Sequence, residues 1–389
     1  MREVAILSAV RTPIGRFLGG LAGVPAPRLG GIVVAEAVRR AGIAPDQVSE
    51  VIMGNVLGAG LGQAPARQAA LAAGLPDTVP ATTVNKMCGS GLKAVMLGAQ
   101  AIQTGDAEIV VAGGMENMSA APFLLDRART GYRLGDGTVV DVILRDGLVD
   151  PWGHGHMGNC AELLARTFKI TRQEQDAFAR ESYRRALAAM ASGASSEEIV
   201  PVDPGGGPPV VEDEEPRRAD FEKMAKLPPV FEEGGTVTAA NASSISDGAA
   251  AVVLASAEAA ARFGRTPLAW IVGQAGAATA PEWFTIAPAS ATWRVLERAG
   301  WTTRGVDLFE INEAFAAVVI AVTRELAVDP DRVNVRGGAV ALGHPIGASG
   351  ARILVTLLST MAAQQARRGV AAVCLAGGEA VAVAVERRA

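Results

Sequence analysis

Short runs that are apolar almost throughout recur along the chain and predict strands that are buried on both faces. They lie at residues 4–10, 48–57 and 108–114. Between them, apolar residues at helical spacing predict helices at residues 29–42 and 91–105, each of which ends at a glycine. This alternation of strands and helices predicts an α/β fold with a mostly parallel sheet that is covered by helices.

The order of these elements returns near the end of the chain. Residues 90–114 (SGLKAV…TGDAEIVVAGG) are similar to residues 349–378 (SGARIL…RRGVAAVCLAGG). Each copy has Ser-Gly at the start of a helix, and then a glycine, a buried strand and a Gly-Gly pair. We therefore expect two copies of one fold, produced by an internal duplication.

The amino-acid composition changes between the two copies. Residues 119–240 are richer in charged residues, proline and glycine, which is typical of an inserted, loop-rich segment. This segment holds one clear helix, at residues 172–190, which a capping box formed by Thr171 and Glu174 opens. A long and partly irregular insertion in a compact enzyme is usually functional, as a binding lid or an oligomer contact.

Composition narrows the class of protein. With 389 residues, 49% hydrophobic and 20% charged, the chain is long enough for two or three domains with a large core. The net charge is −4 and no long basic run occurs, which argues against nucleic acid or an anionic membrane as the main partner.

The cysteines and the N-terminal residues indicate the cellular compartment in which the protein works. Cys88, Cys160 and Cys374 lie far apart and form no CxxC pair, which suits a reducing environment. The opening residues, MREVAILSAVRTP, have too short an apolar run for a signal peptide or a membrane span. We therefore expect a cytoplasmic protein.

Four segments combine a reactive side chain with a turn or the start of a helix after an apolar run. They contain Cys88 (NKMCGSG), Asn312 (NEAF), His344 (GGAVALGHPIGASG) and Cys374 (CLAGG). A cysteine at a helix N-terminus is expected to have a lowered pKa, and backbone N–H groups in such a turn can stabilise an oxyanion. His344 is a candidate base, Cys374 a second acid or base, and Asn312 a group that orients a water or His344.

Each of these signals also has a structural interpretation. A lone cysteine in a turn or a strand is most often a packed core residue, and this holds for Cys88 and Cys374 alike. Cys160 is interpreted as a packed helix residue. His154 and His156 with Cys160 suggest zinc, but they lack a second pair of ligands, so no metal site is expected.

Together, the motifs resemble those of the thiolase family, specifically of acetyl-CoA acetyltransferases and 3-ketoacyl-CoA thiolases. The resemblance extends over essentially the whole chain in the same order. It rests on AVRTPIGRFLGGL (9–21), NKMCGSGLKAV (85–95), AGGMENMS (112–119), DGLVDPWGHGHMG (146–158), GTVTAANASSISDGAA (235–250), INEAFA (311–316), GGAVALGHPIGASGAR (337–352) and CLAGGEA (374–380).

The resemblance implies a fold of two similar βαβαβαββ halves, with five-stranded sheets in an αβαβα layered arrangement and an inserted loop domain. We assign residues 1–118 and 241–266 to the first half, 119–240 to the inserted CoA-binding and tetramerisation domain, and 267–389 to the second half. Residues 122–143 match the loop through which many members assemble as homotetramers, or dimers of dimers. Coenzyme A and acyl-CoA are substrates in this family, so no cofactor is expected.

The resemblance also implies a role for each reactive residue in a reversible Claisen condensation of two acetyl-CoA molecules. Cys88 is the nucleophile that becomes acetylated. His344 activates it and, with a water held by Asn312, forms one oxyanion hole. Cys374 exchanges a proton with the acetyl-CoA carbon, and the backbone N–H groups of Cys88 and Ala376 form the second oxyanion hole.

A further set of residues matches positions that line the CoA tunnel of the family: Leu148, His156, Met157, Phe231 and Ser243. Arg217 matches a position near the nucleotide end of CoA. The chain departs from the family pattern at Ala376, at Glu379 and Ala380, and in PEWFTIAP (281–288). In the last of these, Trp283 and Phe284 bring bulk near the acyl group or the pantetheine, which bears on the preferred acyl chain.

Three other functions remain as alternatives. A thiolase for longer 3-ketoacyl chains differs only in the acyl pocket. A ketoacyl-carrier-protein synthase typically pairs one cysteine with two histidines, or with His and Asn, so the second thiol, Cys374, argues against it. A non-catalytic protein that binds CoA esters or lipids does not need the complete set of reactive residues.

Overall fold

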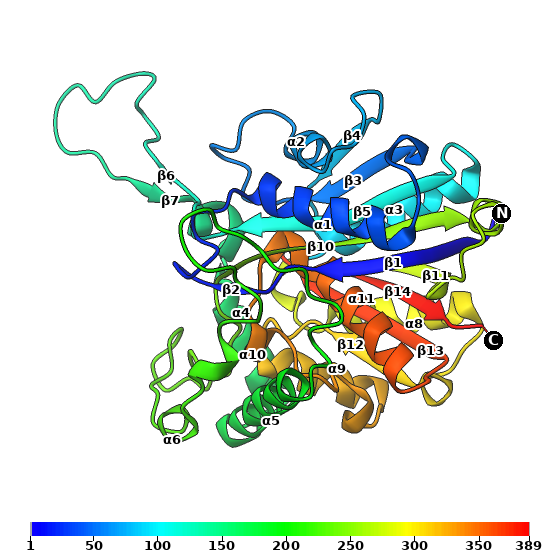
Figure 1. Cartoon of the computed structure of the whole chain (residues 1–389). Helices are drawn as coiled ribbons and strands as arrows, with labels where there is room; N and C mark the ends of the chain where they lie inside the picture. The colour runs from blue at the N-terminus through cyan, green and yellow to red at the C-terminus, as the bar shows by residue number, and fades with distance from the viewer. Residues whose placement is uncertain (1, 389) are drawn as a thin grey trace.

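The computed structural model describes residues 2–388, and its centre is a ten-stranded sheet (Figure 1). The strands follow the order β12-β13-β14-β11-β1-β10-β5-β3-β4, and β2 pairs with β10. They are β1 (Val4–Arg11), β2 (Gly15–Arg16), β3 (Glu50–Gly54), β4 (Ala81–Val84), β5 (Ile109–Asn117), β10 (Ser246–Ser256), β11 (Ala269–Ala278), β12 (Leu308–Ile311), β13 (Arg368–Leu375) and β14 (Glu379–Glu386).

The pairing pattern of the first half is repeated in the second, which confirms the duplicated fold. In the first half, β3 is parallel to β4 and β5, while β10 is antiparallel to β5 and β1. In the second, β12 is parallel to β13, while β14 is antiparallel to β13 and β11. In the second half, a parallel bridge from Phe309 of β12 to Val333 takes the position that β4 takes beside β3 in the first half.

The expectation of a mostly parallel sheet is wrong, because the inner pairs of both halves are antiparallel. In the second half, β14 follows β13 directly after the turn at residues 376–378, whereas β10 of the first half follows the long inserted segment. A tight turn can join only antiparallel strands. The halves also do not form separate sheets, since β1 pairs with β11 through three residue pairs, from Val4–Ile271 to Ile6–Ala269.

Helices form three layers around and within this sheet, which confirms the αβαβα arrangement (Figure 1). α1 (Ala26–Ala41) and α2 (Pro65–Ala72) cover the outer face of the first half. α8 (Ala287–Ala299) and α9 (Ala316–Leu326) cover that of the second. α3 (Ser90–Thr104) and α11 (Ile346–Ala363) pack against each other between the halves.

Judged by length and composition alone, the central helix α11 is long and apolar enough to cross a membrane. However, 83% of it is buried inside the protein. Its place between two sheet faces accounts for its apolar composition, because both sides of the helix contact the core.

Residues 119–240 wrap one end of the layers. β6 (Phe123–Leu124) and β7 (Val140–Asp141) form the base of an arm that projects from the body in Figure 1. Next come β8 (Val149–Asp150), β9 (Gly155–His156), α4 (Met157–Thr167), α5 (Arg172–Ala191) and α6 (Phe221–Met224). The predicted capping box of α5 is present, and Cys160 is buried in α4 as expected. The assigned domain boundaries stay a prediction.

Candidate active site

Cys88 lies in a tight turn between β4 and α3, two residues before the helix begins. Met87 has a left-handed backbone (φ 48°), which turns the chain sharply just before the cysteine. Ser90 fixes the turn, because its hydroxyl accepts from the Lys86 N–H at 2.8 Å and donates to the Met87 carbonyl at 2.6 Å. The thiol is thereby presented at the mouth of a helix, as the sequence predicted.

The expected lowering of the Cys88 pKa is wrong. The pKa of the thiol is raised to about 12, mainly by burial and also by the negative charge of Glu116. The backbone N–H groups of Cys88 and Ala376 act in the opposite direction and lower the pKa of the thiol. Position at a helix N-terminus does not outweigh the loss of water and a nearby carboxylate. Cys88 therefore rests as a thiol and needs a base.

Glu116, at the end of β5, is bound by donors on both carboxylate oxygens. The N–H groups of Val56, Leu57 and Gly347 donate to it at 2.9–3.1 Å, and the Asn55 amide donates at 2.8 Å. Burial raises the pKa of this carboxyl to about 7. Because four donors leave no acceptor for a carboxyl proton, the geometry favours the charged form.

His344 lies between Gly343 and Pro345, just before α11. Gly343 has φ 106°, and a Cβ there would meet the Ser246 hydroxyl at 2.1 Å, so the position requires glycine. The His344 N–H donates to the Ser244 carbonyl at 3.0 Å. The glycine conformation at residue 343 and the hydrogen bond of the His344 N–H therefore fix the backbone that carries the imidazole.

The hydrogen bonds of Ser349 define which nitrogen of His344 carries the proton. The Ser349 hydroxyl lies 2.6 Å from His344 Nδ1 and donates its own hydrogen to the Pro345 carbonyl at 2.9 Å. It can therefore only accept from Nδ1–H. Nε2, which has no partner among the described residues, keeps its lone pair toward the site. The pKa of His344 is lowered to about 3, mainly by burial and also by the positive charge of Arg352, so the imidazole rests neutral.

Cys374 occupies the end of β13 and is 1% exposed. Burial raises the pKa of its thiol, and a negative charge on Cys88 also acts to raise it. Two thiols, one from each half of the duplicated fold, thus lie within electrostatic reach of each other. Ala376 follows in the turn between β13 and β14.

Asn312 follows β12 and is completely buried. Neither atom of its side-chain amide has a hydrogen-bond partner among residues 2–388. Buried polar groups are nearly always paired, so an unpaired amide marks a site that meets another molecule. The next residue, Glu313, accepts from Ser182, Asn334 and the Val340 N–H at 2.7–3.1 Å and so ties this loop to the segment before His344.

A cavity of about 390 Å³ opens at Cys88 and is lined mostly by apolar side chains. Its lining includes Cys88, His344, Ala376 and five residues matched to the CoA tunnel, namely Leu148, His156, Met157, Phe231 and Ser243. His156 stacks on Phe231 with ring centroids 4.7 Å apart, and Phe231 meets Phe315 edge to face at 6.1 Å. Such a tunnel suits a long, thin and largely apolar ligand arm.

Arg217 does not join this cavity. It lies in the 3₁₀ turn Pro216–Arg218, is exposed, and forms an ion pair with Glu212 at 2.7 Å beside a separate surface hollow. The structure therefore gives no support to Arg217 at the nucleotide end of the tunnel.

Sequence reasoning missed the residues that hold the reactive groups in place. Ser349, Glu116 and Glu313 were each visible inside a recognised motif, but only the fold shows what they contact. The spacing of one pair could have indicated its contact: Ser349 lies five residues after His344, in the first turn of the helix that begins at Ile346.

The chain is similar to known proteins over its full length. Residues 4–258 match the thiolase N-terminal domain and residues 265–387 the thiolase C-terminal domain. An acetyl-CoA acetyltransferase from Cupriavidus necator is 54% identical over 393 residues, and one from Escherichia coli is 53% identical over 392; each match covers 100% of both chains. The crystal structure of Acat5 thiolase from Ascaris suum in complex with coenzyme A has a TM-score of 0.95, 46% identity and full coverage of both chains. The chain belongs to the thiolase family.

Proposed function

We propose that the protein is an acetyl-CoA C-acetyltransferase, an acyltransferase that joins two acetyl-CoA molecules into acetoacetyl-CoA and CoA, or reverses this by thiolysis. One observation carries the proposal: Cys88 and a neutral His344 line one apolar cavity, and Cys374 lies within electrostatic reach of Cys88. The names of the C. necator and E. coli relatives agree with it.

The first step transfers an acetyl group to Cys88. His344 Nε2 takes the thiol proton, and the sulfur attacks the thioester carbonyl of acetyl-CoA. The backbone N–H groups of Cys88 and Ala376 hold the carbonyl oxygen as it becomes negative. The departing CoA sulfur takes the proton of Cys374, which leaves acetyl-Cys88, an imidazolium and a thiolate.

The second step forms the carbon–carbon bond. The Cys374 thiolate removes a proton from the methyl of a second acetyl-CoA, and the resulting carbanion attacks acetyl-Cys88. The imidazolium Nε2–H and a water on the Asn312 amide hold the thioester oxygen of the carbanion. Expulsion of the Cys88 sulfur, which regains its proton from His344, releases acetoacetyl-CoA and restores the resting state.

Coenzyme A is proposed to enter along the wall that contains His156, Met157 and Phe231. The Ascaris thiolase, which matches this chain over its full length, was solved in complex with coenzyme A. Use of both thiols in one reaction disfavours a ketoacyl-carrier-protein synthase and a non-catalytic CoA-binding protein.

The test follows loss of acetoacetyl-CoA after addition of CoA, together with the mass of the peptide that contains residue 88 after incubation with acetyl-CoA. Cys88→Ala is expected to abolish turnover and acetylation. Cys374→Ala is expected to retain acetylation of Cys88 but to lose carbon–carbon chemistry. Cys160→Ala, which alters a buried thiol in α4, is the matched control. Wild-type turnover by Cys88→Ala would contradict the proposal.

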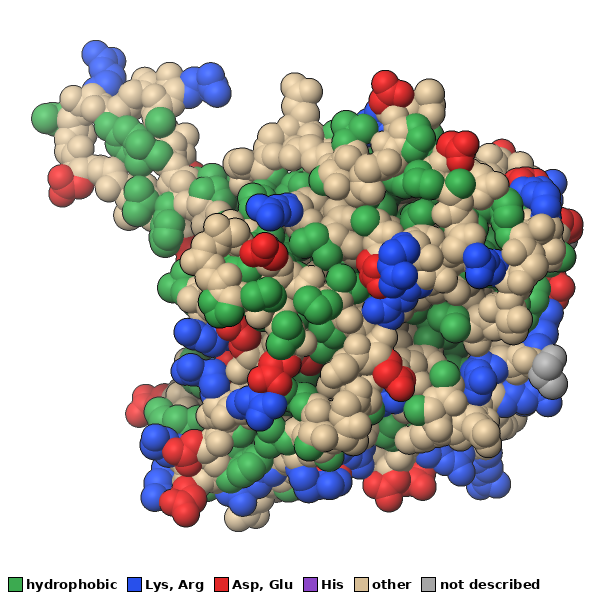
Figure 2. All heavy atoms as spheres, viewed as in Figure 1, with side chains coloured by type: hydrophobic (Ala, Val, Ile, Leu, Met, Phe, Trp, Pro, Cys, Tyr) green, Lys and Arg blue, Asp and Glu red, His purple; other side chains and the backbone are tan. Residues whose placement is uncertain are grey.

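We also propose a cytoplasmic homotetramer that assembles through the arm at residues 122–143. The arm exposes large apolar side chains, with Leu134 100%, Phe123 64% and Val139 64% exposed. Figure 2 shows hydrophobic side chains gathered on this projection. Such a patch is stable when another surface covers it. Light scattering should give a tetramer for the whole chain and a smaller species after residues 126–138 are replaced by a short glycine linker.

A further inference from the structure

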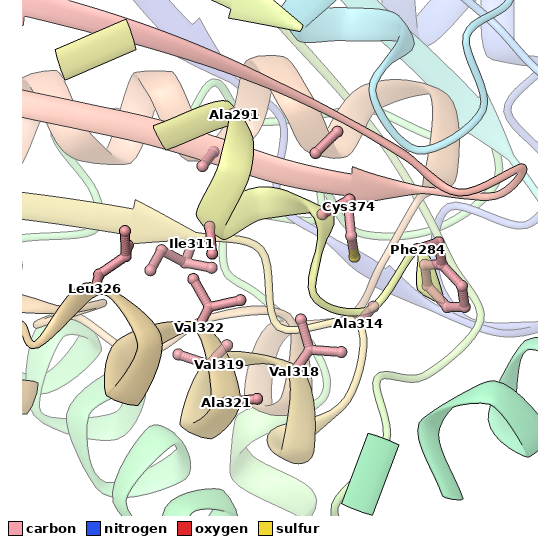
Figure 3. Packing of buried hydrophobic residues seen from close by; sticks show 14 of the residues in the cluster. Phe284, Ala291, Ile311, Ala314, Val318, Val319, Ala321, Val322, Leu326 and Cys374 are labelled. Atoms are coloured by element: carbon pink, nitrogen blue, oxygen red, sulfur yellow. The ribbon is translucent and has the colours of Figure 1, made fainter. Parts of the chain in front are cut away.

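The two N–H groups that hold the first oxyanion in the proposed mechanism lie in turns from different halves of the fold. The Cys88 N–H belongs to the turn between β4 and α3, and the Ala376 N–H to the turn between β13 and β14. Figure 3 shows Cys374 at the end of its strand, just before the chain turns back. Because the two turns are far apart in the sequence, the distance between their N–H groups depends on contacts between the halves.

An ion pair connects these two turns. Lys86, two residues before Cys88, pairs with Glu379, the first residue of β14. The side chains are 32% and 35% exposed, so the pair lies at the edge of the solvent. Glu379 is one of the positions at which the chain departs from the thiolase pattern. The pair is therefore a feature that the family pattern does not supply.

The backbone at each end of the ion pair is held within its own turn or strand. The Lys86 carbonyl accepts from the Gly89 N–H at 3.1 Å, across the residue that carries the reactive thiol. Glu379 pairs with Ala278 of β11 and with Leu375 of β13. A change in the position of either charged side chain is thus passed to a turn that carries an oxyanion donor.

A second contact between the turns lies on the buried side. A Cβ at Gly89 would meet Leu375 Cδ2 at 2.5 Å and Val381 Cγ2 at 3.1 Å, so the Cys88 turn lies directly against β13 and β14. This packing limits how closely the turns approach, but apolar contacts are not directional. The ion pair adds a second point of attachment on the outer side, which opposes rotation of one turn against the other.

We propose that the ion pair between Lys86 and Glu379 positions the two oxyanion donors by holding the Cys88 turn and the Ala376 turn in one relative orientation. Both charged residues are positioning residues, since neither lines the cavity that Cys88 and Ala376 line. This role rests on the proposed function, in which the two N–H groups stabilise the thioester oxygen as Cys88 is acetylated. Such donors act only when they point at the charge that develops, so misalignment slows this step.

The expected effect is modest, because solvent screens a pair that is one-third exposed. An exposed ion pair changes an equilibrium constant by about 1.5- to 5-fold. Glu379→Gln and Lys86→Met should therefore slow acetylation of Cys88 at saturating acetyl-CoA by about the same factor. The double variant Lys86→Glu/Glu379→Lys, which reverses the pair, should recover most of the rate. The dissociation constant of CoA should stay unchanged, because neither residue lines the cavity.

The experiment measures the single-turnover rate of Cys88 acetylation at about 50 mM and about 1 M NaCl. High salt should bring the wild type toward the rate of Glu379→Gln, because it screens the pair that the variant lacks. Alkylation of Cys88 by iodoacetamide is the second readout. It needs the thiolate but no oxyanion donor, so its rate should be unchanged in every variant.

The matched control is Glu108→Gln. It breaks the half-exposed ion pair of Glu108 with Arg262, at 2.6 Å, which also joins segments that are distant in the sequence. Neither residue of this pair lines the cavity. The control should retain wild-type acetylation and the wild-type response to salt. Urea unfolding confirms that each variant is folded.

Three results would overturn the inference. One is a wild-type acetylation rate in folded Glu379→Gln and Lys86→Met. Another is a loss of rate that the reversed pair does not restore; if the double variant does not fold, an equal response of wild type and Glu379→Gln to salt decides against the role. A third is alkylation that slows in step with acetylation, which would implicate the thiol instead of the donors. A wild type that leaves Cys88 unacetylated would instead refute the proposed function.

Discussion

Ser349→Ala offers the sharpest test of the proposed base. The hydroxyl accepts from His344 Nδ1–H at 2.6 Å and cannot donate to it, because its own hydrogen is used by the Pro345 carbonyl. This bond fixes the tautomer that leaves Nε2 free to take the Cys88 proton. It also grows stronger when the ring becomes an imidazolium, so its loss should lower the pKa of His344 further and weaken the base.

The magnitude follows from the kind of bond that is lost. A hydrogen bond to a group that becomes charged contributes about 1.5–3 kcal/mol. At about 1.4 kcal/mol per factor of ten, the variant should acetylate Cys88 roughly 10- to 150-fold more slowly. The alanine adds no bulk, and α11 keeps its other backbone hydrogen bonds.

The assay is a single-turnover measurement of Cys88 acetylation by mass, together with the rate of iodoacetamide alkylation of Cys88 against pH. The matched control is Thr360→Val, which removes a buried hydroxyl that makes the same bond to the carbonyl four residues earlier on α11, at 2.8 Å. The control should retain wild-type acetylation. Wild-type rates and an unchanged pH profile in Ser349→Ala would refute the role assigned to this serine.

Three further predictions follow from the site. Glu116→Gln removes a negative charge that raises the pKa of Cys88, so alkylation of Cys88 should begin at lower pH. The free energy of unfolding should also fall by about 1–3 kcal/mol, because the glutamine amide cannot accept a hydrogen bond from every donor around residue 116. Alkylation of Cys88 against pH measures the first effect, and urea unfolding measures the second. The pKa of His344 is lowered to about 3 in the folded protein, against about 6.5 in the unfolded chain, so the unfolded chain binds more protons between these values. Stability should thus fall below about pH 6.5, by up to about 1.4 kcal/mol per pH unit, and His344→Gln should show a weaker fall between urea midpoints at pH 7 and pH 5. Phe231→Ala removes the ring on which His156 stacks and should raise KM for CoA about 10-fold, more than it lowers kcat, as steady-state thiolysis would show.

The sequence predicted the parts of the fold that depend on local pattern. The helix at 91–105 ends where Gly105 adopts a left-handed backbone (φ 90°), and the helix at 172–190 begins at its capping box, because the signals for both lie within a few residues. Strand direction depends instead on how distant segments meet. The apolar run of β14 gave no sign that it turns back beside β13.

The reactive residues were found from their motifs, but their electrostatics were not. Position before a helix suggested a low pKa for Cys88, whereas the fold buries the thiol and places Glu116 behind it, 28 residues away in sequence. Likewise, Arg217 matched by alignment alone, and the structure pairs it with Glu212. Such effects come from long-range packing that no local pattern encodes.

The joint between β1 and β11 has a consequence for the precision of catalysis. Cys88 belongs to one copy of the ancestral unit, and His344 and Cys374 belong to the other, so neither copy alone contains a reaction centre. A slip of this joint by one residue would displace one copy against the other by about 3.4 Å, more than a hydrogen bond can tolerate. The position of His344 relative to the Cys88 sulfur thus depends on backbone pairing between β1 and β11, two strands that contact no substrate.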